Sequence, residues 1–96
     1  MGRQVIAIDW DDTYTADPEL WRAFIESALA RKHTVLIVTC RMDTDENREY
    51  LMEVTGLPAW RHIFTSMSPK RSFCAERGWV PTIWIDDMPE SILFGR

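Results

Sequence analysis

Three carboxylates follow an apolar run near the start of the chain. Residues 5–8 are apolar, and Asp9, Asp11 and Asp12 come after them with one tryptophan in between. A short apolar run bounded by polar residues predicts a buried strand that ends where the acids begin. In parallel α/β sheets, ligands bind at the edge formed by the carboxyl ends of the strands. Because close carboxylates repel one another, a cation that prefers oxygen ligands, such as Mg²⁺, would stabilise them. The segment therefore indicates either a metal site or a solvated acidic turn.

Three further strand-like runs also end in polar residues. They carry no charged alternation, which is typical of strands buried on both faces of a sheet. Residues 34–38 lead into Thr39-Cys40-Arg41, residues 62–64 into Thr65-Ser66, and residues 82–85 into Asp86-Asp87.

A helix is predicted between the first two strands. From Pro18 to Lys32, apolar residues recur at spacings of three and four, which gives the helix one buried face. Asp17 can cap its first turn and Pro18 fits the first helical position, so its start is well marked. The residues expected on the buried face are Leu20, Trp21, Phe24, Ile25, Ala28 and Leu29.

A second helix is predicted after the second strand. It starts near residues 43–45 and ends at Gly56, since glycine is a common helix terminator. We expect Tyr50, Leu51 and Val54 to face inward.

A third helix is predicted after the third strand, with Ser68 as its cap and Pro69 in its first turn, ending near Arg77 before Gly78. Alternating strands and helices imply right-handed βαβ crossovers and a mostly parallel sheet. We therefore predict a three-layer, Rossmann-like α/β fold with four strands.

Length and composition predict one domain. With 96 residues, 46% of them hydrophobic, the chain has room for a single domain over residues 1–96. Such a small domain buries a limited fraction of its surface, which is compatible with a homo-oligomer. Of the five tryptophans, we expect Trp21, Trp79 and Trp84 in the core. We also expect Trp10 and Trp60 in the core. The alternative for these two is a position near the acidic edge of the sheet.

Charge and cysteine content narrow the classes of protein to which the chain could belong. Eleven basic and fifteen acidic residues give a net charge of −4, and the basic residues are scattered. This distribution offers no broad surface for nucleic acid but leaves local binding of a strand end open. Cys40 and Cys74 lack CxxC spacing, which argues against a disulfide framework or zinc site and favours reduced thiols in a cytoplasmic protein. We expect no signal peptide and no membrane span.

The polar strand ends follow an order known from one family. Asp9-x-Asp11-x-Thr13, then Thr39, then Lys70 at a helix start, then Asp86-Asp87 resemble the four motifs of the haloacid dehalogenase (HAD) superfamily. The motifs cover nearly the whole chain. Taken singly, each has a simpler explanation as a strand end, a solvated lysine or a helix cap, whereas the ordered set is specific.

The resemblance implies a role for each matching residue. Asp9 would be the nucleophile that forms an aspartyl-phosphate, and Asp11 the general acid and then the base. The family's dehalogenases lack an acid at this second position, so Asp11 favours phosphoryl transfer over cleavage of a carbon–halogen bond. Thr39 would hydrogen-bond a phosphate oxygen, and Lys70 would neutralise the nucleophile and the transferring group.

The resemblance also implies Mg²⁺ as the cofactor. Asp86 would bind it together with the Asp9 side chain and the Asp11 backbone carbonyl. Asp87 would either contact the metal through water or orient Lys70. The implied activity is that of a Mg²⁺-dependent phosphatase acting on phosphate monoesters.

The chain departs from the family pattern in two ways. Asp12 stands where the first motif usually has glycine, and Ile85 where a glycine often precedes the last acids. Family members also commonly insert a cap domain, but neither the interval after Thr13 nor that between Thr39 and Lys70 has room for one. A site without a cap suits a large substrate, unless a second subunit supplies the lid.

The segment Thr39-Cys40-Arg41 is similar to the Thr/Ser-x-Arg form of the second motif in polynucleotide phosphatases and some nucleotidases. We assign it to substrate binding, with Arg41 forking onto a phosphate or a neighbouring acid, or remaining a surface charge. The expected partner is a phosphorylated substrate, with nucleotide or nucleic-acid ends ranked above phosphoproteins.

Two other classes share part of this pattern. A receiver-like signalling domain also gathers acids, a hydroxyl and a lysine at a sheet edge, but its phosphorylated aspartate follows the third strand, where this chain has Thr65-Ser66. The other is a catalytically silent module that binds Mg²⁺ or phosphate.

Overall fold

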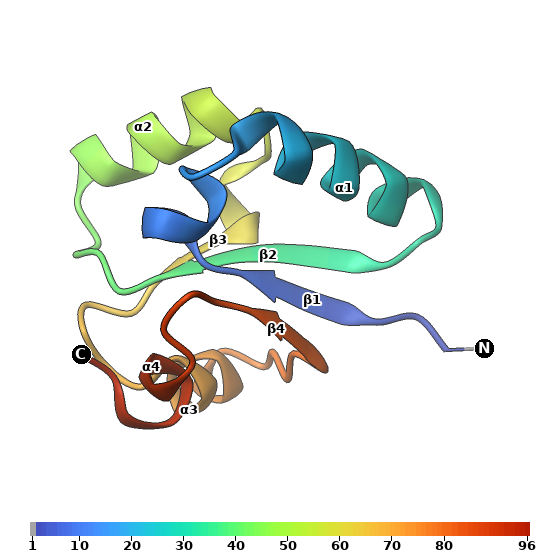
Figure 1. Ribbon diagram of the computed structural model, residues 1–96. Coiled ribbons are helices and arrows are strands. Elements are labelled where there is room, and N and C mark those ends of the chain that lie inside the picture. Colours follow the sequence, from blue (N-terminus) through green and yellow to red (C-terminus); the bar gives the residue numbers. More distant parts are fainter. Residues whose placement is uncertain (1) are drawn as a thin grey trace.

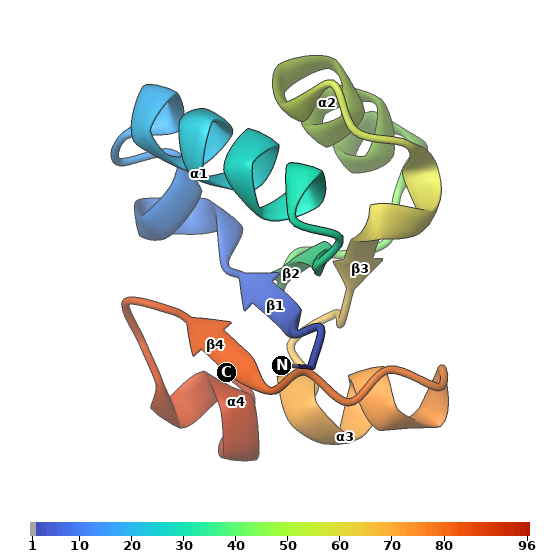
Figure 2. The same ribbon diagram turned by 90° about the vertical axis from the view of Figure 1, so that its right-hand side faces the viewer.

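Four short strands form a parallel sheet at the centre of the computed structural model, which describes residues 2–96. Every neighbouring pair is parallel, and the order across the sheet is β3-β2-β1-β4 (Figure 2). This arrangement confirms the predicted four-stranded parallel α/β layout. The strands are β1 (Val5–Ile8), β2 (Thr34–Thr39), β3 (His62–Phe64) and β4 (Ile83–Ile85).

Helices cover both faces of the sheet and make three layers (Figure 1). On one face lie α1 (Pro18–Ala30) and α2 (Asp45–Thr55), and on the other lie α3 (Lys70–Glu76) and α4 (Glu90–Phe94). Successive residues of a strand point to opposite faces. Ile6 and Ile8 of β1 therefore pack under α1 and α2, whereas Ala7 packs on the α3 side. This burial on both faces explains the unbroken apolar runs of β1, β2 and β3. In the edge strand β4, Ile83 is 41% exposed.

Two predicted helix ends are confirmed. The Asp17 side chain accepts a hydrogen bond from the Leu20 amide at 3.2 Å, and Pro18 is the first residue of α1. Gly56 ends α2 in the left-handed conformation, at φ 71°, and its amide donates to the Met52 carbonyl. No helix within residues 2–96 combines the length and the apolarity needed to cross a membrane.

The start of α3 differs from the prediction. Helix α3 begins at Lys70, and Pro69 occupies the cap position without a side-chain hydrogen bond, so the assignment of Ser68 as cap was wrong. Just before it, Ser66 and Met67 are both left-handed, at φ 52° and 71°. Their amides donate to carbonyls of the loop after β2, which keeps the chain out of helical conformation until Pro69.

Three apolar side chains predicted to face inward are exposed. Leu20, 54% exposed, lies in the first turn of α1 beside the acidic edge of the sheet. Tyr50, 46% exposed, packs edge-on against the buried ring of Trp10, and the Arg41 guanidinium lies 5.6 Å from its ring centroid. Trp60, 52% exposed, lies in a 3-10 turn, η2 (Ala59–Arg61), beside the outermost strand, where no further element covers it. The remaining tryptophans are buried or pack against the core clusters, as predicted.

His62 at the start of β3 makes stability depend on pH. Its ring nitrogens lie 2.9 Å from the Thr55 hydroxyl and 3.1 Å from the Pro58 carbonyl oxygen. Burial lowers the pKa of His62, and the contact with the Pro58 backbone opposes this only in part. Because the folded-state pKa is below the unfolded one, its stabilising contribution is present near neutrality and is lost as the pH falls through the folded-state value.

Relative to a His62→Gln variant, we expect the wild type to lose free energy of unfolding between pH 7 and pH 5. Urea unfolding of both proteins at the two pH values measures the difference. Identical pH dependence in the two proteins would contradict the assignment.

Candidate functional site

The carboxyl ends of β1 and β4 bring distant acids together. Asp9 follows β1 directly, and its amide donates to the Ile85 carbonyl of β4 at 2.9 Å. Because β4 pairs with β1, Asp86 and Asp87 lie next to Asp9 despite their distance in the sequence. Each of these three acids offers a carboxylate oxygen within 4.8 Å of the other two. We call Asp9, Asp86 and Asp87 the acidic cluster.

Lys70 joins this cluster from the helical layer. It is the first residue of α3 and only 1% exposed. Its Nζ donates to Asp9 Oδ1 at 2.7 Å and to Asp86 Oδ2 at 2.6 Å. Burial alone would lower the pKa of Lys70, but the hydrogen bonds to Asp86 and Asp9 outweigh it and raise that pKa. The ammonium group is therefore charged at neutral pH and crosslinks two strand ends.

Thr13 connects the other side of the cluster. Its hydroxyl lies 3.0 Å from Asp9 Oδ2 and 3.1 Å from Asp87 Oδ1, and it accepts a hydrogen bond from the Asp87 amide. A hydroxyl has one proton, so it can donate to only one of these two carboxylates at a time. Whichever of Asp9 and Asp87 does not receive the Thr13 proton lacks this hydrogen-bond donor, so a cation beside that carboxylate would be favourable.

The charge balance fits a divalent cation. Three carboxylates face one ammonium group, which leaves two negative charges uncompensated. Burial raises the pKa of Asp9 to about 6, although Lys70 opposes the shift. All the donors are oxygens, the set that hard cations such as Mg²⁺ and Ca²⁺ prefer. The acidic cluster can therefore hold a metal ion.

Asp11 makes a separate ion pair. Arg41 Nε and Nη2 donate to its two carboxylate oxygens at 3.0 and 2.9 Å, a bidentate arrangement. Nη1 of the same guanidinium donates to Asn47 Oδ1 of α2 at 3.0 Å. A phosphate and a neighbouring acid were the partners expected for Arg41, and in the structure Arg41 pairs with the neighbouring acid. The Asp11 side chain is not part of the acidic cluster.

Thr39 and Cys40, the other two residues of the predicted substrate-binding segment, are more deeply buried than Arg41. Thr39 is buried at the end of β2, and its Oγ1 accepts a hydrogen bond from the Arg41 amide at 3.2 Å. Cys40 is also buried, and its carbonyl accepts from Met67 in the loop that leads to Lys70. The structure thus ties the loop after β2 to the loop before α3.

The backbone at position 12 explains one departure noted in the sequence. Asp12 is left-handed, at φ 65°, and its amide donates to the Thr15 hydroxyl at 3.0 Å. Glycine adopts this conformation most readily, and aspartate is among the few other residues that tolerate it. The aspartate is therefore compatible with the turn that follows β1.

Three contributing residues were not assigned a role from the sequence. Thr13 was part of the first motif and could have been singled out on that basis. Asn47, which holds Arg41, and Ser91, whose hydroxyl lies 3.3 Å from Asp86 Oδ2, carry no local pattern that would identify them. Beside the cluster, between α1 and β4, lies a hollow of about 370 Å³ bordered by Leu20, Trp21 and Asp87.

Comparison with known proteins adds no relative: no family model, curated protein or solved structure matches the chain. The fold and site define an α/β protein with a carboxylate cluster at the carboxyl edge of its parallel sheet. Any function is inferred from the residues and their geometry.

Binding of Mg²⁺ should stabilise the folded chain. A ligand at 100 times its dissociation constant stabilises by about 2.7 kcal/mol, which for a domain of this size raises the melting temperature by roughly 10 °C or more. We expect this increase for the wild type, its reversal by chelator, and its loss in Asp87→Asn. Asp45→Asn, on an exposed helix start, is the matched control and should keep the shift. A wild-type melting temperature that does not respond to Mg²⁺ would refute the metal site.

Proposed function

We propose that the chain is a Mg²⁺-dependent phosphatase of the HAD type that hydrolyses phosphate monoesters through an aspartyl-phosphate on Asp9. The observation that carries the proposal is the direct hydrogen bonding of Lys70 to both Asp9 and Asp86, with Asp87 within metal-binding reach of both acids. These residues belong to three of the four motifs noted in the sequence, and the fourth, Thr39, ends the strand beside β1. Their meeting at one sheet edge is what a phosphoryl-transfer site requires.

The nucleophile would be the Asp9 carboxylate. With a pKa of about 6, Asp9 is mainly ionised at neutral pH. Its attack forms an oxygen–phosphorus bond and breaks the ester bond, and Asp11 gives the leaving oxygen a proton. Asp11 then takes a proton from water, which attacks the phosphorus, releases phosphate and restores Asp9.

The neighbouring side chains would orient the phosphate. The Thr39 hydroxyl accepts from the Arg41 amide and keeps its own proton for a phosphate oxygen. Lys70 supplies positive charge to the nucleophile and to the phosphoryl group. Mg²⁺ held by the acidic cluster would neutralise charge on the transferring group.

Arg41 would have two successive partners. In the free protein its guanidinium holds both carboxylate oxygens of Asp11 in a bidentate pair. A phosphate oxygen is an equally suitable partner for a guanidinium. Substrate binding would therefore draw Arg41 from Asp11 and release that acid for proton transfer.

Hydrolysis of a generic phosphate monoester tests the proposal. We expect turnover by the purified chain with Mg²⁺ and none with excess chelator. Asp11→Asn should reduce the rate by about 10²- to 10⁴-fold, the usual contribution of general acid–base catalysis, and Asp45→Asn should not. Turnover that persists in chelator, or in Asp11→Asn at the wild-type rate, would contradict the mechanism.

A second candidate is a silent module that binds Mg²⁺ and phosphate without turnover. The bidentate pair of Asp11 with Arg41 favours it, because this pair, in which Asn47 holds the guanidinium, keeps the acid away from the cluster. Binding of Mg²⁺ and beryllofluoride without hydrolysis of any monoester would distinguish it from a phosphatase.

A further inference from the structure

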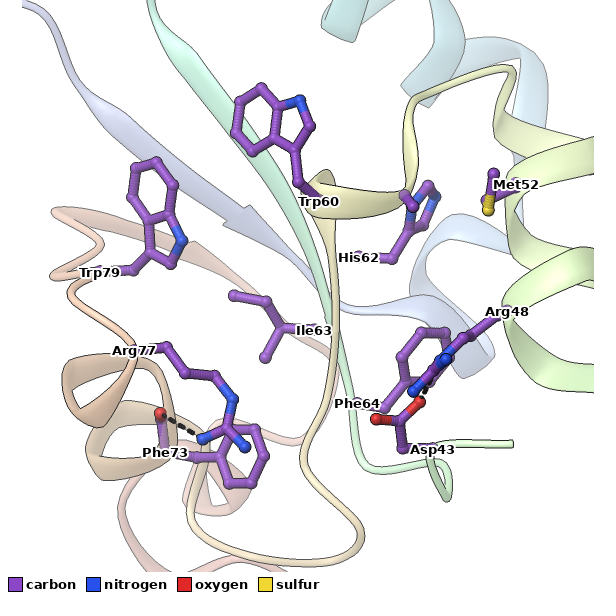
Figure 3. A pocket seen from close by; sticks show the side chains of 11 residues that line it. Asp43, Arg48, Met52, Trp60, His62, Ile63, Phe64, Phe73, Arg77 and Trp79 are labelled. Atoms are coloured by element: carbon purple, nitrogen blue, oxygen red, sulfur yellow. Dashed lines mark hydrogen bonds and ion pairs between the residues drawn. The ribbon is translucent and has the colours of Figure 1, made fainter. Parts of the chain in front are cut away.

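A groove of about 460 Å³ lies along the outer edge of β3, two strands away from β1 and its acidic cluster. Its volume is within the range of ligand pockets. Figure 3 shows Trp60 and Trp79 at one end, Arg48 and Asp43 at the other, and β3 between them. The proposed phosphatase chemistry uses none of the residues that line it.

The groove presents aromatic rings to solvent. Trp60, exposed and in η2, lies nearly parallel to Trp79, with an angle of 15° between the planes and 5.9 Å between the ring centroids. Parallel rings at this separation are offset, and Trp60 remains 52% exposed although the Arg61 guanidinium lies over its ring. Phe73 of α3 adds a third ring to the wall. Arg77 covers one face of Phe73, so Trp60 and the adjoining Trp79 are the stacking surfaces offered to nucleobases of any sequence.

Guanidinium groups accompany the rings. Arg77, in the wall of the groove, lies 3.6 Å over the ring of Phe73. Arg61 does not line the groove; it lies 4.2 Å over Trp60, and its Nη1 donates to the Val35 carbonyl. No carboxylate of residues 2–96 lies within ion-pair distance of either guanidinium, whereas Arg48 is paired with Asp43. This edge therefore carries uncompensated positive charge on a chain whose net charge is −4. A polyanion is the complementary ligand.

Peptide strand addition fits this edge poorly. An extended peptide binds a sheet edge mainly through backbone hydrogen bonds. Strand β3 has only three residues, and the amide of the first, His62, already donates to the Ala59 carbonyl. Little of the edge is left for a peptide backbone to pair with, so side-chain stacking and charge are what the groove offers.

We propose that this groove binds single-stranded nucleic acid, with bases on Trp60 and Trp79 and phosphates at Arg77, in its wall, and at Arg61, beside it. At its other end the groove reaches Asp43, two residues beyond Arg41 and so at most about 7 Å along the chain. A bound strand would therefore extend toward the acidic cluster. The identification of its terminal phosphate as the substrate rests on the proposed function, whereas binding of the strand does not.

Fluorescence anisotropy with a labelled single-stranded oligonucleotide that has hydroxyl ends tests binding by the full chain. Trp60→Ala should weaken binding about tenfold or more, the usual effect of losing one stacked base. Arg77→Glu should weaken it and reduce the slope of log affinity against log salt by about one. The matched controls Phe94→Ala and Arg31→Glu, at exposed positions outside the groove, should bind as the wild type does.

Circular dichroism verifies the fold of each variant, and Trp60→Phe, which keeps a ring, should retain most of the affinity. Absence of binding at low salt would overturn the proposal, and so would equal weakening by the controls or preferential binding of an acidic peptide.

Assays of a monoester and of the oligonucleotide separate the two proposals. Binding that depends on Trp60, without hydrolysis of any monoester, retains the groove and rejects the phosphatase. Monoester hydrolysis with oligonucleotide binding unchanged in Trp60→Ala retains the phosphatase and rejects the groove.

Discussion

An Asp9→Asn variant should lose turnover by at least about 10³-fold, because the amide cannot attack phosphorus and no other group replaces a lost nucleophile. The fold should survive. Asparagine has the shape of aspartate, and its carbonyl oxygen can still accept from Lys70 Nζ, which lies 2.7 Å from Asp9 Oδ1. Loss of activity without loss of structure is therefore the expected result.

The same variant should be at least as stable as the metal-free wild type at pH 7. Burial raises the folded-state pKa of Asp9 from 3.8 to about 6. Its contribution to stability is thus fully present below the unfolded-state value and is lost as the pH rises through about 6. Relative to Asp9→Asn, the metal-free wild type should lose stability between pH 4 and pH 7.

Rates with and without Mg²⁺, together with thermal unfolding in chelator at pH 4 and pH 7, measure both effects. Asp45→Asn again serves as the control. Retained phosphatase activity in Asp9→Asn would refute the nucleophile assignment.

A Lys70→Met variant should show the largest loss of stability. It leaves Asp9 and Asp86 without the ammonium group that both contact. Removing one partner of a buried ion pair typically costs about 3–5 kcal/mol, a large part of the total stability of a small domain. Because a divalent cation at the acidic cluster supplies the missing charge, Mg²⁺ should restore part of the loss. Activity should not return, since the charge that faces the phosphoryl group is absent.

Urea unfolding followed by tryptophan fluorescence, with and without Mg²⁺, measures this change. The other lysine of the chain provides a matched control, because Lys32 is exposed and Lys32→Met should change stability little. Equal stability of Lys70→Met and the wild type would show that the pair contributes nothing to folding.

Much of the fold could be predicted because its signals are local. Four apolar runs become strands, Asp17 and Gly56 mark helix ends, and alternation along the chain implies a parallel sheet. The predicted burial of single side chains was wrong where burial depends on which elements pack beside the residue. Trp60 and Leu20 are as apolar as their buried neighbours. Trp60 is exposed because the sheet ends beside it, and Leu20 is exposed because it lies in the first turn of α1, at the edge of the sheet.

The sequence by itself determined which residues could form a site, since acids, a threonine and a lysine at strand and helix ends are visible in the order of the chain. Only the tertiary structure decided how they meet. The pairing of β4 with β1 places Asp86 and Asp87 beside Asp9, and the packing of α3 carries Lys70 between them. It also decided that Arg41 holds Asp11 and that a groove lies beyond β3. The reason is physical: residue type and spacing specify local conformation, whereas contacts between distant segments depend on strand order and helix packing, which no single segment encodes.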